Sequence, residues 1–263
     1  MPSIHTIPDS DSYNWIIVPI TRCVQSVSDG AKLSGLLQRA VSALANQHIL
    51  LNQVEALLKA IGTGGQYTED LLTPEPNWVQ WSRELIDNGL HELHVPGIIA
   101  LWASLEVAVE DTAVLILLED AQALIDTSLA GVKLPSSCPS PLDEFNARRI
   151  FTRFEQVSRR TRNIAQAYAH ILQTFGVSTS VAPEILETLA ELNYVRNCLL
   201  HRGGVVDSRV SLEAPKASLA VGDVVHVSEH DYGRYFNAVG SFALEILNGT
   251  IASRHARWKV PGH

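Results

Sequence analysis

The sequence predicts an all-α helical bundle that carries a small β-hairpin appendage near its C-terminal end. Apolar residues recur at three- and four-residue spacings through most of the chain, a period typical of helices with one buried face. Hydrophobic residues make up 46% of the 263 residues, which is enough for a sizeable core. Alternation with a period of two, typical of strands, appears in two short stretches after residue 204.

The N-terminal part of the chain is expected to form a tail and a helical extension. An apolar, β-branched run over 14–20 predicts an edge strand or an extended segment lying on the helices. An apolar stripe over 32–61 predicts one long helix or two short ones, and the proline-containing stretch 65–77 predicts a linker. We therefore divide the chain into an N-terminal extension, 1–77, and a helical domain, 78–263.

Two helices are predicted next, over 78–94 and 97–125. Trp78 and Trp81 begin the first helix, and we expect them to pack in the core, with base stacking as the alternative. The second helix is the most apolar of the chain, but charged residues interrupt it, so we expect no membrane-spanning helix.

Two carboxylates, Glu106 and Glu110, lie one turn apart on the helix over 97–125. Such a pair can perform acid–base chemistry or bind a metal, and it can equally form a solvated patch or ion pairs with arginines. No histidine and cysteine set completes a zinc site in this sequence. We therefore expect neither a metal nor another cofactor.

A loop over 128–143, with three prolines, precedes a long predicted helix over 144–175. Six of the chain's 20 Lys and Arg residues lie within fifteen positions of this helix, namely Arg148, Arg149, Arg153, Arg159, Arg160 and Arg162. These arginines form either a solvated face or a surface that attracts a polyanion. Because the formal net charge of the chain is −8, such a local cluster would direct a polyanion to this helix.

A helix predicted over 185–200 ends at Gly203 and Gly204, which suit the left-handed backbone that commonly ends a helix. Its last turns carry Arg196, Asn197 and His201. Arginine presents a planar fork that matches phosphate oxygens, and histidine can donate or accept a proton near neutral pH. Together these groups could hold a phosphate and move the proton of a ribose 2′-hydroxyl.

Arg196 and His201 are five residues apart, so they lie roughly 140° apart around a straight helix. They would converge within one chain if the last turn were loosened by the glycines.

At the start of this helix, Ser178 or Thr179 is expected to be the capping residue, with Pro183 in the first turn. After it, a hairpin is predicted over 205–228 and a last helix over 231–247.

The string from Leu192 to Gly204, Leu-x-x-x-Arg-Asn-x-x-x-His-Arg-Gly-Gly, resembles the Arg-x4-6-His signature of the HEPN family (higher eukaryotes and prokaryotes nucleotide-binding). The family favours a polar residue after the arginine, and Asn197 fits. The resemblance covers 95–248 and implies a HEPN-like bundle in which two chains bring two motif copies to one cleft. It also implies that an acidic residue of a neighbouring helix, here Glu106, orients Arg196.

The resemblance implies a metal-independent endoribonuclease in which Arg196, His201 and Asn197 are catalytic. We expect the substrate RNA to be bound by the basic side chains Arg149, Arg153, Arg159, Arg160, Arg162 and Arg202. Family members of this kind often act as toxins or in antiviral defence, so a separate antitoxin or regulator protein is a further expected partner. The alternative is a non-catalytic dimeric module that binds a nucleotide, RNA or a protein partner with the same cleft.

Composition sets two further bounds. The three cysteines, Cys23, Cys138 and Cys198, are odd in number and far apart, which suits a reducing, cytoplasmic compartment better than a disulfide framework. The net charge of −8 counts against strong non-specific binding of nucleic acid and favours the binding-module alternative.

Overall fold

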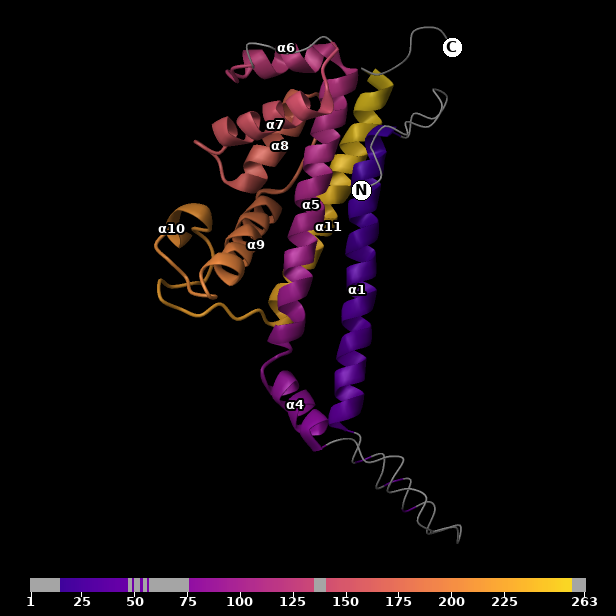
Figure 1. The fold of residues 1–263 in the computed structure, drawn as a ribbon, viewed down its shortest axis with the longest axis vertical. Helices are drawn as coiled ribbons and strands as arrows, with labels where there is room; N and C mark the ends of the chain where they lie inside the picture. Colours follow the sequence, from indigo (N-terminus) through magenta and orange to yellow (C-terminus); the bar gives the residue numbers. More distant parts are fainter. Residues whose placement is uncertain are drawn as a thin grey trace.

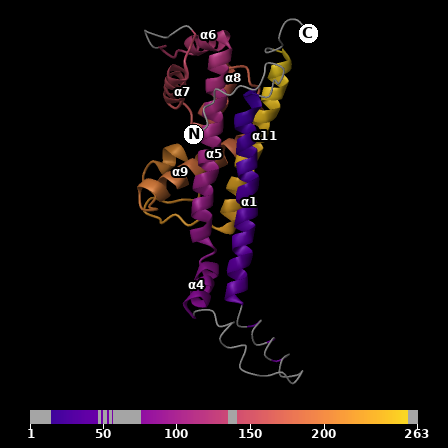
Figure 2. The same ribbon diagram turned by 45° about the vertical axis from the view of Figure 1, so that its right-hand side comes forward.

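Three long helices lie side by side and form the frame of the molecule: α1 (Val18–Ala45), α5 (His91–Glu119) and α11 (Glu229–Ala256) (Figures 1 and 2). The structure is a computed structural model that describes residues 15–46, 49, 53, 56, 76–134 and 141–256. These residues form helices and no strand, which confirms the predicted all-α class.

Shorter helices surround this frame. They are η1 (Trp15–Ile17), α4 (Pro76–Asp87), α6 (Ala121–Leu129), α7 (Glu144–Ser158), α8 (Ile164–Thr174), α9 (Pro183–His201) and α10 (Val210–Glu213). In Figure 1, α9 and α10 lie on one side of α5, and α1 lies on the other. Helix α5 is the most apolar of the described helices and buries most of its length against its neighbours, with Trp102, Leu105 and Val109 fully buried.

The described part of the N-terminal run, 15–20, is helical, so its prediction as an edge strand or extended segment was wrong. Helix α1 begins at Val18, well before the predicted start at 32. Pro19 lies in the first turn, where a missing backbone N–H costs nothing. Ile20, Cys23 and Val27 then follow at helical spacing and are buried. Most of the predicted continuation to residue 61, and most of the predicted linker, lie outside the described residues.

The α4–α5 junction divides the predicted helix over 78–94. Gly89 and Leu90 have left-handed backbones, with φ of 62° and 60°, and α5 begins at the next residue. The predicted helix over 97–125 is also divided, because the side chain of Asp120 accepts a hydrogen bond from the backbone N–H of Gln122 and caps α6. The predicted burial of Trp78 and Trp81 was wrong, since both are exposed and meet edge to face.

The predicted helix over 144–175 is two helices, α7 and α8. Asn163 caps α8 by accepting from the N–H of Gln166 at 2.9 Å, and the side chain of Gln166 accepts from the N–H of Asn163 at 3.2 Å. The apolar period continues across the break because both helices bury a face in the same core. As a result, Arg159, Arg160 and Arg162 lie in the turn between the helices, not on a helix face.

The predicted hairpin is not confirmed. Val205 and Val224 form one isolated antiparallel bridge, flanked by hydrogen bonds from the N–H of Val206 to Asp223 O and from the N–H of Val225 to Gly204 O. The short helix α10 occupies the segment between the two arms of this bridge. The predicted last helix is confirmed and extended as α11, with its inward residues Tyr235, Val239 and Phe242 buried.

One core cluster joins α1 to the rest of the molecule. It includes Ile20 and Cys23 of α1, Trp102 of α5 and Phe242 of α11. The predicted segments 1–77 and 78–263 therefore share buried contacts. The boundary at residue 77, between the N-terminal extension and the helical domain, stays a prediction.

Helix α11 approaches the chain segment before α9 so closely that a side chain does not fit at Gly249. A Cβ atom there would overlap the backbone carbonyl oxygen of Ser178 and lie 2.9 Å from its carbonyl carbon. We expect Gly249→Ala to lower the free energy of unfolding by roughly 2 kcal/mol, as overpacking does. Gly233→Ala is the matched control on the same helix, because its Cβ meets nothing within 4 Å.

Gly233→Ala should raise the free energy of unfolding by about 0.5 kcal/mol, since alanine loses less backbone entropy in a helix than glycine. Denaturant titration followed by circular dichroism measures both changes. Equal stabilities of the two variants would contradict the close approach of α11 to Ser178.

Candidate functional site

Helix α9 carries the predicted motif, and its limits agree with the prediction. Leu192, Val195 and Cys198 are buried, while Arg196 and Asn197 are partly exposed. Gly203 and Gly204 have the predicted left-handed backbone, with φ of 59° and 79°.

The expected side-chain cap of α9 is absent. The N-cap residue is Ala182, and its side chain makes no capping hydrogen bond. Pro183 is in the first turn as predicted. Thr179, one of the two predicted caps, instead accepts hydrogen bonds from Gln173 through its hydroxyl and carbonyl oxygens. The start of α9 is therefore set by the proline and by packing.

Arg196 lies between Asn197 and Glu106. Its Nη1 donates to Asn197 Oδ1 at 3.1 Å, and its Nη2 is 4.0 Å from Glu106 Oε2. Its Nε is buried and has no partner among the described residues. The carboxylate that we expected to orient Arg196 does lie beside it, although this role stays a prediction. The guanidinium keeps further N–H donors for another ligand.

His201 is exposed and makes no hydrogen bond or ion pair with a described residue. The helical hydrogen-bond pattern continues past it, because the N–H of Arg202 donates to Cys198 O at 3.0 Å. The last turn is therefore not loosened at His201. Within one chain, His201 stays roughly 140° around α9 from Arg196, and no hydrogen bond joins the two side chains in the described part of the chain.

The predicted RNA-binding arginines differ in what holds them. Arg202 is engaged inside the molecule, where it pairs with Asp207 at 3.2 Å and lies over the Tyr194 ring. Arg153 donates to the backbone oxygen of Lys133, and Arg149 lies over the ring of Phe145. None of these contacts tests RNA binding, which stays a prediction for all of them.

Arg148 and Arg159 are held by carboxylates. Arg148 binds Glu110 at 2.7 Å and Asp111 at 2.8 Å, which identifies Glu110 as an ion-pair partner of the arginine-rich segment. Arg159 pairs with Glu155 at 3.3 Å. Burial raises the pKa of the Glu155 carboxyl, while the charge of Arg159 opposes the shift. The acidic side of α5 therefore adjoins α7 through Arg148, whereas the pair of Arg159 is local to the end of α7.

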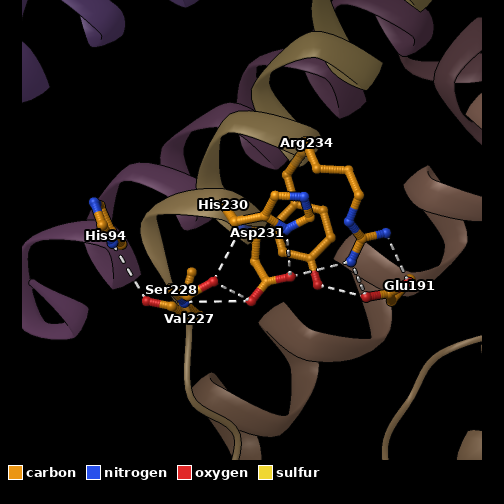
Figure 3. Close-up of polar contacts among 8 residues, drawn as sticks. His94, Glu191, Val227, Ser228, His230, Asp231 and Arg234 are labelled. Carbon is orange, nitrogen blue, oxygen red and sulfur yellow. Dashed lines mark hydrogen bonds and ion pairs between the residues drawn. The ribbon is translucent and has the colours of Figure 1, made fainter. Parts of the chain in front are cut away.

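A partly buried ion-pair network between α9 and α11 was not anticipated from the sequence. Arg234 of α11 forms a two-pronged pair with Glu191, and Tyr235 donates to the same carboxylate at 2.8 Å (Figure 3). Asp231, next to Arg234 in Figure 3, accepts from the hydroxyl of Ser228 and adds a second contact to Arg234. Glu191 holds the pKa of Arg234 above its ordinary value, although burial opposes this.

This network joins α9 to α11 and shows that Glu191, directly before the motif string, has a structural role. The partners are 43 residues apart, so no local pattern in the sequence could have revealed them. Nearby, His94 approaches the backbone oxygen of Val227 at 3.3 Å (Figure 3). Both contacts fix the segment that leads into α11.

Comparison of the chain with models of protein families, with curated proteins and with solved structures gave no match. In the described ranges, no three histidine, cysteine, aspartate or glutamate side chains come together as a set of metal ligands. Within the same ranges, no helix has the length and apolar character needed to cross a membrane. The geometry around α9 is therefore the basis for a functional proposal.

The two carboxylates that contact arginines near the motif should differ in their contribution to stability. Glu191→Gln leaves the partly buried Arg234 with only its longer contact to Asp231, so we expect a loss of about 2 kcal/mol in the free energy of unfolding. Glu106→Gln should cost less than about 1 kcal/mol, because its ion pair is long and solvent-accessible. Thermal and denaturant unfolding measure both, and a larger loss for Glu106→Gln would reverse this assignment.

Proposed function

We propose that this protein is a metal-independent endoribonuclease of the HEPN type. The proposal rests on one observation: α9 carries Arg196 and Asn197 in mutual contact beside Glu106, and His201 stands exposed at its end. The basic turn Arg159–Arg162 and the exposed Arg149 and Arg153 supply positive charge for RNA. The resemblance to toxin and defence members of this family suggests the same kind of role, with a separate regulator protein.

In this mechanism the nucleophile is the 2′-hydroxyl of the substrate. His201 takes the proton from this oxygen, which then attacks the adjacent phosphorus, and the bond to the 5′-oxygen of the next nucleotide breaks. Arg196 stabilises the added negative charge on the phosphate oxygens, while Asn197 holds the guanidinium in place. The leaving 5′-oxygen receives a proton, and the products are a 2′,3′-cyclic phosphate and a 5′-hydroxyl.

The positions of Arg196 and His201 favour a site built from two chains. Because α9 stays helical through His201, the two side chains point in directions roughly 140° apart. A two-fold dimer with the exposed ends of α9 facing each other would bring Arg196 of one chain to His201 of the other. The proposed active form is therefore a homodimer.

Mixing two inactive variants tests this shared site. Arg196→Ala and His201→Ala should each reduce cleavage roughly 100-fold or more, with little change in melting temperature, because both side chains are at least partly exposed. After co-refolding at equal amounts, roughly a quarter of the wild-type rate should return, since half of the dimers are mixed and each has one complete site. A monomer by light scattering, or no recovery on mixing, would show that the site is not shared.

The chemistry can be tested with a modified substrate. Cleavage should persist in EDTA and should give the cyclic phosphate and 5′-hydroxyl ends identified by mass spectrometry. An oligonucleotide with a single 2′-deoxy sugar at the cut site should bind with unchanged affinity but remain intact, because it lacks the nucleophile. Cleavage of that oligonucleotide, or activity that a chelator removes and a divalent ion restores, would point to a metal-bound water as the nucleophile.

A non-catalytic dimeric module is the second candidate, and two observations favour it. Arg196 is engaged by Asn197 and Glu106, and the chain carries a net charge of −8. Such a module would bind a nucleotide, RNA or a protein with the same face of α9. Saturable RNA binding by the purified protein without any cleavage would select this alternative.

A further inference from the structure

A cavity of about 520 Å³ lies beside the face of α9 that carries the motif. It is bounded by the turn between α7 and α8, the first turn of α8, the middle of α9, and α10 with the turn that follows it. This volume is in the range of small-ligand sites. Its lining residues include Arg160, Arg162, Ile164, Asn193, Leu212 and Lys216.

The cavity is basic, and two of its cations are not neutralised. Lys216 pairs with Glu187 at 2.5 Å, and Arg159 pairs with Glu155 outside the cavity. The side chain of Arg160 has no hydrogen bond or ion pair with any described residue, and that of Arg162 bonds within the described ranges to the neighbouring Thr161 hydroxyl. In a chain with a net charge of −8, two arginines without carboxylate partners at one cavity favour an anionic ligand.

Asn193 gives an independent indication of a ligand. Its side chain lines the cavity, is 7% exposed, and makes no hydrogen bond with a residue of the described ranges. Neither amide atom is among the fully buried side-chain atoms that lack a partner, so the amide can be reached from the cavity by a ligand. A ligand group inside the cavity would supply both a donor and an acceptor for this amide.

The remaining walls distinguish a nucleotide from a simple anion. The N-terminus of α8 lies at the cavity wall, and although Asn163 already accepts the N–H of Gln166 there, the helix dipole still favours negative charge at this end. Leu212, which is 81% exposed, and Pro215 add apolar surface at the opposite wall. A nucleotide would match these walls. Its phosphate would lie at the arginines, its base against the apolar wall, and a polar edge of the nucleotide at the amide of Asn193.

We propose that this cavity binds one nucleotide of the RNA strand, away from the bond that is cut. Asn193 precedes Asn197 by one helical turn on the same face of α9, so the cavity adjoins the motif. Arg160 and Arg162 donate to the phosphate, and Asn193 reads the base or the sugar. The choice of RNA as the source rests on the proposed function, whereas the nucleotide chemistry rests on the cavity.

The test measures binding without cleavage. Fluorescence anisotropy follows a labelled 2′-O-methyl oligonucleotide of mixed sequence, which lacks a reactive 2′-hydroxyl, at several salt concentrations. The double variant Arg160→Gln/Arg162→Gln should weaken binding roughly 30-fold at low salt. It should also reduce the slope of log K against log salt by about 0.7, which is the effect of one lost phosphate contact on a single strand.

Two variants serve as comparisons. Arg22→Gln/Arg39→Gln makes the same change in net charge at exposed positions of α1, away from the cavity, and should alter the affinity less than about threefold. Asn193→Leu should weaken binding about tenfold with no change in the salt slope, because the amide contacts an uncharged group. It should not lower the melting temperature, since it replaces an unpartnered buried amide by an apolar side chain.

Each outcome decides between the proposals. Equal effects of the cavity pair and the α1 pair would overturn the cavity as a ligand site, even if RNA is cleaved. Binding that depends on the cavity, in a protein that cleaves no RNA, would support the cavity and reject the nuclease. Calorimetry with adenosine and uridine 5′-monophosphates and with inorganic phosphate shows whether the cavity binds a free ligand or an RNA strand. If a mononucleotide binds tightly and the cavity variants bind the oligonucleotide with unchanged affinity, the RNA strand is not the ligand of the cavity.

Discussion

The burial of the apolar residues of α5 against several neighbouring helices is the constraint on which the arrangement depends. Leu105, Val109 and Ile116 have almost no exposed surface, and α1, α7, α9 and α11 all pack on this helix. Each neighbour must turn an apolar face toward α5, since apolar surface left in water would cost free energy. For α9, this requirement directs Leu192 and Val195 inward and leaves the polar motif residues on the outer side.

Ion pairs then fix how α9 sits on that core. The pair of Glu191 with Arg234 holds it to α11, and Arg202 with Asp207 ties the end of the helix to the segment that follows. Arg148 makes a similar link from α7 to α5. Several arginines of this acidic chain thus form ion pairs within the fold. The two arginines at the cavity have no carboxylate partner in the described structure, which supports a role for them in binding an anion.

The motif and the cavity occupy neighbouring positions on α9, but they differ in whether a second chain is needed to complete the site. In the proposed mechanism the motif needs a second chain, because helical geometry separates Arg196 from His201. The cavity is complete within one chain and needs only a ligand of matching charge and size. A strand that contacts both would lie along the outer face of α9, so a binding function and a catalytic function can share this face without sharing residues.

The sequence by itself determined the all-α class, the limits of α9, the left-handed glycines that end it and the inward face of α11. It also placed Glu106 near the motif arginine through the family resemblance. These features depend on residues close together in the chain or on a recognisable motif. The helical period of apolar residues did not reveal the helix breaks at Asp120 and Asn163. The helices on both sides of each break bury a face in the same core, so the apolar pattern continues across the break.

Only the tertiary structure decided which charged groups are paired. Arg148 and Glu110 are 38 residues apart, and Arg234 and Glu191 are 43 apart, distances at which no periodic pattern connects two residues. The cavity likewise depends on α10 and the α7–α8 turn meeting beside Asn193. Hydrophobic periodicity records which face of an element is buried, whereas the partner of a polar group depends on where packing brings distant elements together.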